Sequence, residues 1–383
     1  MSLVVDEHRQ YLSDQPRISA FRQAIAEVVK PGAVVLDLGA GTGILGLLAC
    51  QAGASRVYSI DEGGMIELAR SICRANGFQD RVVFIKNLSL HVDLPEKVDV
   101  VVADQIGRFG FDAGVLEYFS DARERFLKPG GIMIPSLVDL CVAPVEHQEM
   151  WNQVEFWNTA PAGFDFHPVR TQAANTGYPV KYRPEHLLGV PATGATLDLA
   201  VATPAPFDVE ASIRATRAGT LHGIGGWFSA QLAPDVSMTN SPLAPHPINR
   251  HNVFFPIDQP VSLAEGDHIQ INMRIMPADL VVSWNVEVSA ADQHSKSQVK
   301  GSFTHSTWKG MLVSKEDLLR TRPTFAPKLT PRGEARLSVL SLCDGQRALL
   351  EIEQEVYQRH PTLFRSLSEA ATFVAEVITR YSV

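Results

Sequence analysis

Cysteine is scarce in this sequence and widely spaced. The four cysteines among the 383 residues are Cys50, Cys73, Cys141 and Cys343. None belongs to a CxxC pair, and three lie in apolar runs, which is typical of reduced structural thiols rather than of a disulfide framework. The twelve histidines also lack the close spacing of metal ligands. The sequence therefore predicts neither disulfides nor a bound metal.

Long hydrophobic runs and clusters of positive charge are missing as well. The chain is 45% apolar and 20% charged, and no apolar run approaches the roughly 18 residues of a membrane span. The first ten residues contain no basic region followed by an apolar one, so no secretion signal is expected. A formal net charge of −8 argues against general nucleic-acid binding, which needs clustered Lys and Arg. These absences predict a cytoplasmic globular protein with no membrane or nucleic-acid partner.

The most informative stretch joins an apolar run, an acid and a glycine turn. Residues 34–49 read VVLDLGAGTGILGLLA, which predicts a strand, a tight turn with Gly39, Gly41 and Gly43, and a helix. Asp37 precedes this turn, where a carboxylate would repel the pyrophosphate of a dinucleotide but would suit a cationic ligand. S-adenosyl-L-methionine carries a sulfonium and an ammonium group, so we predict it as the cofactor. A purely structural strand-to-helix corner is the alternative.

A second short apolar strand ends in an acid at Asp61, 18 positions after Gly43. This is close to the roughly 20-residue spacing at which a carboxylate meets ribose hydroxyls. We therefore predict Asp61 as the ribose ligand, with the adjacent Glu62 as a substitute. Capping of the helical stretch 65–76 is the alternative role for either acid.

The pattern of apolar segments changes near residue 145. Before it, short apolar strands alternate with amphipathic segments, which predicts a doubly wound parallel α/β sheet of Rossmann-like type. These strands are Val34–Leu38, Val57–Ile60, Val82–Ile85, Val98–Ala103 and Ile132–Pro135. From about 195 to 310, segments such as 219–232 and 261–275 are rich in β-formers, as in an antiparallel sandwich or barrel. A basic, proline-containing linker at 320–332 then precedes three helical segments.

Several of these stretches together resemble the protein arginine methyltransferases. The matching stretches are residues 35–45, 52–54, 57–61, 93–99 and 127–135. Residues 12–22 are similar to the family's N-terminal helix, where an arginine meets the cofactor's carboxylate, and Arg17 is the matching position. A solvated surface charge is the alternative for Arg17. Ser89 falls where the family has its adenine-contacting acid, and it is the last candidate for the cofactor site.

The residues that would bind the methyl acceptor differ from those of the family. Family members hold a substrate guanidinium with two glutamates on the loop after the fourth strand, and that loop here is residues 103–114, ADQIGRFGFDAG. Asp104 takes the first position, whereas the second falls on Ala113, with Asp112 beside it. Arg108 adds a positive charge to the same loop. We predict Asp104 as the acid nearest the acceptor and Asp112 as a second catalytic candidate, with turn-forming aspartates as the alternative for both.

The chemistry of methyl transfer limits what this loop can do. An in-line displacement at a sulfonium needs the acceptor lone pair about 3 Å from the methyl carbon. A neutral amine or hydroxyl needs one base, whereas a guanidinium needs anionic groups that fix its plane. The sequence thus predicts an S-adenosyl-L-methionine-dependent methyltransferase acting on a nitrogen of a protein or peptide. A methyltransferase for a small-metabolite amine or hydroxyl and a catalytically silent cofactor-binding scaffold remain alternatives.

The predicted domains are an N-terminal helical segment (1–30), a cofactor-binding domain (31–145), a β-barrel domain (146–320) and a helical C-terminal domain (333–383). The resemblance implies a homodimer formed through an arm, which we place near 157–188. The C-terminal segment loosely resembles winged-helix domains similar to the peptide chaperone of pyrroloquinoline quinone synthesis. A helical cap packed on the barrel is the alternative for that segment.

Overall fold

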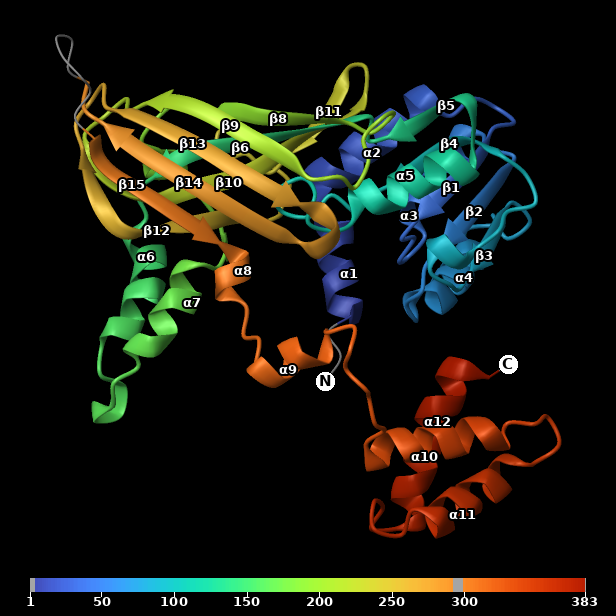
Figure 1. Cartoon of the computed structure of the whole chain (residues 1–383). Coiled ribbons are helices and arrows are strands. Elements are labelled where there is room, and N and C mark those ends of the chain that lie inside the picture. The colour runs from blue at the N-terminus through green and yellow to red at the C-terminus, as the bar shows by residue number, and fades with distance from the viewer. Residues whose placement is uncertain (1–3, 292–298, 383) are drawn as a thin grey trace. The chain divides into compact units, whose positions relative to one another are not determined.

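The computed structural model describes residues 4–291 and 299–382 (Figure 1). It divides into two compact units, Met1–Met311 and Leu312–Val383. Across these described ranges, no helix combines the length and apolar character that a membrane crossing needs. The finer division into four domains stays a prediction.

Two helices open the first unit, α1 (Val4–Ser13) and α2 (Gln15–Val28). Asp14 separates them and caps α2, because its side chain accepts a hydrogen bond from the backbone N–H of Arg17. Pro16 lies in the first turn of α2, where its missing N–H costs nothing. The cap fixes Arg17 in that first turn, with its side chain buried.

A five-stranded parallel sheet follows, in the order β3-β2-β1-β4-β5. Its strands are β1 (Val34–Leu38), β2 (Arg56–Ile60), β3 (Val82–Ile85), β4 (Val98–Ala103) and β5 (Leu127–Ile134). The intervening helices are α3 (Ile44–Ala52), α4 (Met65–Ala75), η1 (Ser89–His91) and α5 (Val115–Arg125). All five residues of β1 are buried, as expected for a central parallel strand covered on both faces. The glycine turn, Asp61 and the loop after β4 therefore lie at the carboxyl end of one sheet, where open α/β folds bind ligands.

Two antiparallel sheets form the rest of the first unit. One has the order β7-β12-β10-β6-β8, with β11 paired to β10, and the other has the order β15-β14-β13-β9. Their strands are β6 (Leu137–Val145), β7 (Tyr178–Val180), β8 (Ala192–Asp198), β9 (Phe207–Arg214), β10 (Gly219–Ala233), β11 (Val236–Thr239), β12 (Asn252–Leu263), β13 (His268–Met276), β14 (Val281–Ser289) and β15 (Val299–Ser306). In the described residues the two sheets remain separate, so the barrel is not closed. The predicted fold class is confirmed, since Rossmann-like α/β, antiparallel β and helical segments follow one another as expected.

A helical arm projects from the antiparallel sheets (Figure 1). It is built from α6 (Gln148–Glu155) and α7 (Arg170–Ala174), with short 3-10 turns between them. The remaining short elements are η2 (Phe156–Asn158), η3 (Pro161–Gly163), η4 (His167–Val169), η5 (Pro184–His186), η6 (Pro277–Asp279) and α8 (Thr307–Gly310). The arm overlaps the stretch 157–188 that we associated with dimerisation, and that role stays a prediction.

One hydrophobic core runs through both parts of the first unit. It includes residues of the parallel sheet and of both antiparallel sheets, among them Leu36, Phe109 and Trp284. Phe109 comes from the loop after β4, and its ring centroid lies 5.5 Å from that of Phe255 on β12. Gly226 on β10 leaves room for this contact, because a Cβ there would lie 2.8 Å from the Phe109 ring. The antiparallel sheets therefore hold the loop that carries Asp104.

The second unit contains α9 (Lys315–Arg320), α10 (Pro331–Leu342), α11 (Leu349–Arg359) and α12 (Leu367–Tyr381). Helices α10, α11 and α12 share a separate core that includes Val339, Val356 and Val374. The three helical segments that the sequence predicts after the linker are present as α10, α11 and α12. The likeness to a peptide-chaperone domain stays a prediction.

Candidate functional site

The glycine turn between β1 and α3 forms one wall of a cleft. Gly39, Gly41 and Gly43 have φ angles of 65°, 52° and 78°, in the left-handed region that glycine tolerates best. The turn is also closely approached, because a Cβ on Gly39 would lie 2.5 Å from Nε2 of Gln105, and one on Gly41 would lie 2.6 Å from Cε1 of His8. The predicted turn residues therefore lie where side chains from α1 and the loop after β4 converge.

Asp37 lies beneath this turn and is completely buried. Its Oδ2 accepts hydrogen bonds from the N–H of Gly46 (3.0 Å) and from Ser59 Oγ (3.5 Å), so it satisfies an N–H in the first turn of α3. Its Oδ1 has no hydrogen-bond partner among the described residues. Burial raises the pKa of Asp37 to about 7. A cation bound at the turn would favour the ionised carboxylate.

Asp61 holds two backbone segments at the other end of the cleft. Its carboxylate accepts hydrogen bonds from the N–H groups of Gly41 (2.7 Å) and Gly63 (2.6 Å). Asp61 lines a cavity of about 150 Å³ together with Glu62 and Ser89. The three candidates for the ribose and adenine end of a nucleoside thus lie together.

Gln105 lies between two parts of the cleft. It lines both the 150 Å³ cavity with Asp61 and a neighbouring cavity of about 120 Å³ that contains Arg17 and Gly41. Its Oε1 is buried and, within the described part of the chain, has no hydrogen-bond partner. Buried polar atoms of this kind are rare in folded proteins unless a ligand or water satisfies them.

These features fit S-adenosyl-L-methionine. The unpartnered oxygen of Gln105 can face a donor group, Arg17 can pair with a carboxylate, and Asp61 can accept from hydroxyls. The cofactor roles of Arg17, Asp37, Gly39, Gly41, Gly43, Asp61 and Ser89 remain proposals. The geometry brings Arg17, Gly39, Gly41, Asp61 and Ser89 to the two adjoining cavities, whereas Gly43 lines neither of them. Asp37 lies outside these cavities and accepts a hydrogen bond from the first turn of α3.

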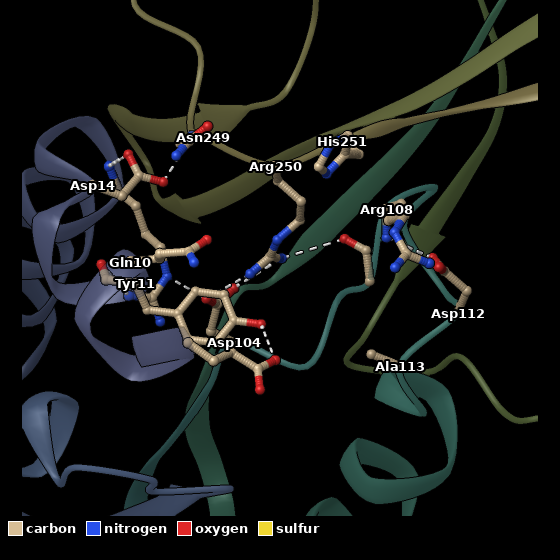
Figure 2. Close-up of a pocket in the computed structure, with 13 residues that line it drawn as sticks. Gln10, Tyr11, Asp14, Asp104, Arg108, Asp112, Ala113, Asn249, Arg250 and His251 are labelled. Carbon is tan, nitrogen blue, oxygen red and sulfur yellow. Dashed lines mark hydrogen bonds and ion pairs between the residues drawn. The ribbon is translucent and has the colours of Figure 1, made fainter. Parts of the chain in front are cut away.

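Asp104, at the end of β4, lies between two arginines (Figure 2). Arg17 donates from Nε to Asp104 Oδ2, and Arg250 donates from Nη2 to Oδ2 (2.9 Å) and from Nη1 to Oδ1 (3.3 Å). The side chains of Arg17, Asp104 and Arg250 are only 8%, 8% and 14% exposed. Burial acts to raise the pKa of Asp104, but the two guanidinium groups outweigh it, and the pKa lies below its ordinary value. Asp104 is therefore an ionised carboxylate at neutral pH and a weak proton acceptor.

A larger cavity of about 400 Å³ adjoins this cluster. Its wall combines α1, the loop after β4 and the loop before β12, and its residues include Tyr11, Arg108, Asp112, Asn249 and His251 (Figure 2). This is the candidate acceptor cavity. Tyr11, Arg17, Asp104 and Arg250 line both this cavity and the 120 Å³ part of the cofactor cleft.

Asp112 lies on the wall of the acceptor cavity, but one of its oxygens already has partners. Oδ1 accepts hydrogen bonds from the backbone N–H groups of Arg108 (2.7 Å) and Phe109 (2.8 Å). This is the arrangement of a turn-forming aspartate. Its catalytic role remains a proposal, as does that of Asp104. Ala113, at the place of the family's second glutamate, brings no polar side chain.

The sequence analysis did not identify Arg250 as a partner of Asp104. It also missed His8, Tyr11 and Gln105 in the cleft. A contact between residues 146 positions apart leaves no local pattern in a single sequence.

Family models match most of the first unit. The model of the arginine methyltransferase oligomerization subdomain matches residues 138–289, and that of the ribosomal protein L11 methyltransferase matches residues 21–138. An arginine N(omega)-methyltransferase of Streptomyces achromogenes subsp. streptozoticus is 30% identical over 275 residues, which are 70% of this chain and 75% of that protein. Protein arginine N-methyltransferase 6 of Xenopus laevis is 29% identical over 290 residues, which are 72% of this chain and 85% of that protein.

Solved structures of the same kind share the fold. The Trypanosoma brucei PRMT1 enzyme-prozyme complex with AdoHcy has a TM-score of 0.69 at 20% identity, covering 78% of this chain and 97% of that one. Arabidopsis thaliana protein arginine methyltransferase 10 has a TM-score of 0.68 at 23% identity, with the same coverage. Sequence and fold together place this chain in the protein arginine methyltransferase family of S-adenosyl-L-methionine-dependent methyltransferases.

Proposed function

We propose that this chain transfers a methyl group from S-adenosyl-L-methionine to a nitrogen of a protein or peptide acceptor. The observation that carries the proposal is the shared wall of two cavities. Tyr11, Arg17, Asp104 and Arg250 line both the cofactor cleft next to the glycine turn and the 400 Å³ cavity. An acceptor in the larger cavity can therefore reach a reactive group held in the cleft.

Each group in the cleft has a specific role in this proposal. Asp61 and the glycine turn bind the nucleoside, Arg17 binds the carboxylate of the cofactor, and Asp37 fixes the turn on α3. When bound, the cofactor supplies an electrophilic methyl group on a sulfonium. Asp104 stays ionised beside the acceptor and orients it through charge-assisted hydrogen bonds.

We also infer that the protein works in the cytoplasm as a homodimer. The match to an oligomerization subdomain over residues 138–289 and the projecting arm of α6 and α7 support this inference. Sedimentation of the full chain tests it. A species of twice the 41.9 kDa chain mass is expected, and a monomer at working concentrations would contradict it.

The first experiment on the function is a titration of the full chain with S-adenosylhomocysteine, followed by labelled-methyl transfer to peptides containing arginine, lysine or histidine. Asp61→Ala removes the acceptor of the Gly41 and Gly63 N–H groups, so we expect it to abolish nucleoside binding. Asp80→Ala, at an exposed surface position, is the control.

Label on a nitrogen of a peptide would support the proposal. Label only on small-molecule amines or hydroxyls would redirect it to the metabolite alternative. Tight cofactor binding without label on any acceptor would favour the scaffold alternative.

A further inference from the structure

Arg250 binds Asp104 as a substrate guanidinium would be bound. Two of its nitrogens donate to the two oxygens of Asp104, at 3.3 and 2.9 Å. The same Nη1 also donates to the backbone carbonyl of Gly107 at 3.3 Å. The guanidinium carbon lies 5.9 Å from the ring centroid of Phe228. A paired carboxylate, a carbonyl and an aromatic face together form a complete guanidinium site, and here the chain fills it with its own arginine (Figure 2).

The other acids of the acceptor cavity each accept a hydrogen bond from a donor of the chain other than an arginine side chain. Asp112 accepts two N–H groups of its own loop, and Asp14 accepts the N–H groups of Arg17 and Asn249. Glu7 accepts the hydroxyl of Tyr11 at 3.3 Å. Among the described residues that line the cavity, Asp104 is thus the one deeply buried carboxylate whose oxygens pair with arginine side chains.

The backbone around Arg250 is held in place on both sides. The N–H of Asn249 donates to Asp14 Oδ2 (2.8 Å), and Asn240 Nδ2 donates to the carbonyl of His251 (2.9 Å). The N–H of Arg250 itself donates to the carbonyl of Ile248 (2.8 Å). A guanidinium presented by a tethered loop competes with a free one at a high effective concentration.

We propose that Arg250 is a specificity-determining residue that keeps external guanidinium groups away from Asp104 and reserves the acceptor cavity for an uncharged nitrogen, such as a neutral amine. The inference rests on the proposed function, since it names the acceptor class of that same site. An uncharged acceptor would distinguish this chain from an enzyme that holds a substrate arginine between two glutamates. Asp104 pairs with both Arg17 and Arg250, so the three side chains carry one excess positive charge, which the cofactor's carboxylate can balance through Arg17.

The test is an NMR titration of the full chain with methylguanidine, with and without S-adenosylhomocysteine. Arg250→Met removes the competing guanidinium, and Asp104 keeps a partner in Arg17, so the carboxylate is not left unpaired. We expect methylguanidine to bind Arg250→Met about tenfold or more tightly than wild type, because a hydrogen bond to a charged group becomes available. Arg250→Lys keeps the charge without the paired donors and is expected to fall between the two.

The matched control is Arg108→Met, which removes the same charge from the same cavity without freeing Asp104. Arg108 uses only its backbone in the hydrogen bonds of this loop. We expect a change of less than about threefold from the lost repulsion of an exposed charge. The double variant Arg250→Met, Asp104→Asn should return methylguanidine binding to the wild-type level.

Binding of methylguanidine by wild type as tight as by Arg250→Met would overturn the proposal. An equal gain in Arg108→Met would also overturn it, since charge alone would then explain the effect. A cooperative unfolding transition and an amide NMR spectrum as well dispersed as that of wild type show that a variant is folded, and if Arg250→Met fails this check, Arg250→Lys decides. Because methylguanidine binding needs no turnover, the absence of methyl transfer would refute the proposed function and leave this test intact.

Discussion

Asp104 stabilises the fold around the site, because it is the counter-charge of two buried arginines. Its carboxylate separates two buried guanidinium groups, and without it Arg17 and Arg250 would face each other with no counter-charge. Breaking a buried ion pair on one side typically costs 3–5 kcal/mol, because the remaining charge stays desolvated. The residue that we propose to position the acceptor is therefore also expected to stabilise the fold around it.

Asp104→Asn tests this argument. We expect it to lower the free energy of unfolding by about 3–5 kcal/mol, measured by urea denaturation. Asp208→Asn is the matched control, because Asp208 pairs with Arg274 at 2.8 Å while both side chains are about half exposed. That control should cost less than about 1 kcal/mol. Equal losses in the two variants would contradict the view that burial makes the Asp104 pairs strong.

His222 links stability to pH. It is 2% exposed on β10, its Nδ1 accepts the N–H of His147 (3.1 Å), and its Nε2 lies 2.9 Å from Gln148 Oε1. These partners require a neutral ring that donates from Nε2. Burial lowers the pKa of His222, although Glu146 opposes the shift.

A lowered pKa means that the unfolded chain binds the proton first as pH falls. The stability due to neutral His222 is therefore complete above its unfolded pKa, about 6.5, and is lost as pH drops below that value. We expect unfolding free energies measured from pH 7.5 to 5.5 to fall less in His222→Asn than in wild type. His91→Asn is the control for loss of an exposed histidine. The same pH dependence in wild type and His222→Asn would refute the assignment.

At the scale of elements, the loop between β4 and α5 requires a glycine at position 107. Gly107 has a φ of 79°, and a Cβ there would collide with Oδ1 of Asp112, the oxygen that holds the loop. A change at Gly107 should therefore move Asp104 relative to Arg250, whose Nη1 also donates to the carbonyl of Gly107. The cofactor cleft on the other side of Asp104 depends on the glycine turn and should keep its shape.

Gly107→Ala is expected to abolish methyl transfer while S-adenosylhomocysteine binding changes by less than about threefold. Gly130→Ala is the matched control, because Gly130 has a φ of 76° with no atom within 4 Å of a Cβ. The control carries a similar backbone strain of about 1 kcal/mol but no collision, and it should retain transfer. Loss of transfer in both variants would show that general destabilisation, and not the loop, is responsible.

Most elements could be predicted because their patterns are local. The strands at Val34–Leu38 and Val98–Ala103 are apolar runs buried on both faces, and the structure has them at these bounds. The β-rich segment 261–275 contains the end of one strand and most of the next. The chain turns after β12, where Gly266 has a φ of 88°, and returns as β13. An Ala-Glu-Gly-Asp turn between two alternating strands has little pattern of its own to separate them.

The site was predictable only where it is local. The glycine turn and Asp61 are read from strand ends of one sheet, so their proximity follows from the topology. The Asp104 and Arg250 contact depends on how the antiparallel sheets pack on the loop after β4 through Phe109. Packing between distant elements is decided by side-chain shape, which one sequence does not reveal.

At the scale of the whole molecule, the separate hydrophobic cores indicate which parts of the chain unfold together. The core that holds the site joins the parallel sheet to both antiparallel sheets, so these parts should unfold together. The core of α10, α11 and α12 contains residues of the second unit alone, among them Val339 and Phe373. The residues that line the site all lie in the first unit.

We expect two calorimetric transitions for the full chain. With roughly 0.7 kcal/mol of unfolding enthalpy per residue near 60 °C, the unit Leu312–Val383 should absorb a few tens of kcal/mol and the first unit about 200 kcal/mol. S-adenosylhomocysteine should raise only the larger transition, since every residue of the cleft lies in the first unit. Val356→Ala, in the core of the second unit, should lower only the smaller one. A single transition that both changes shift together would mean that the two units unfold as one cooperative body.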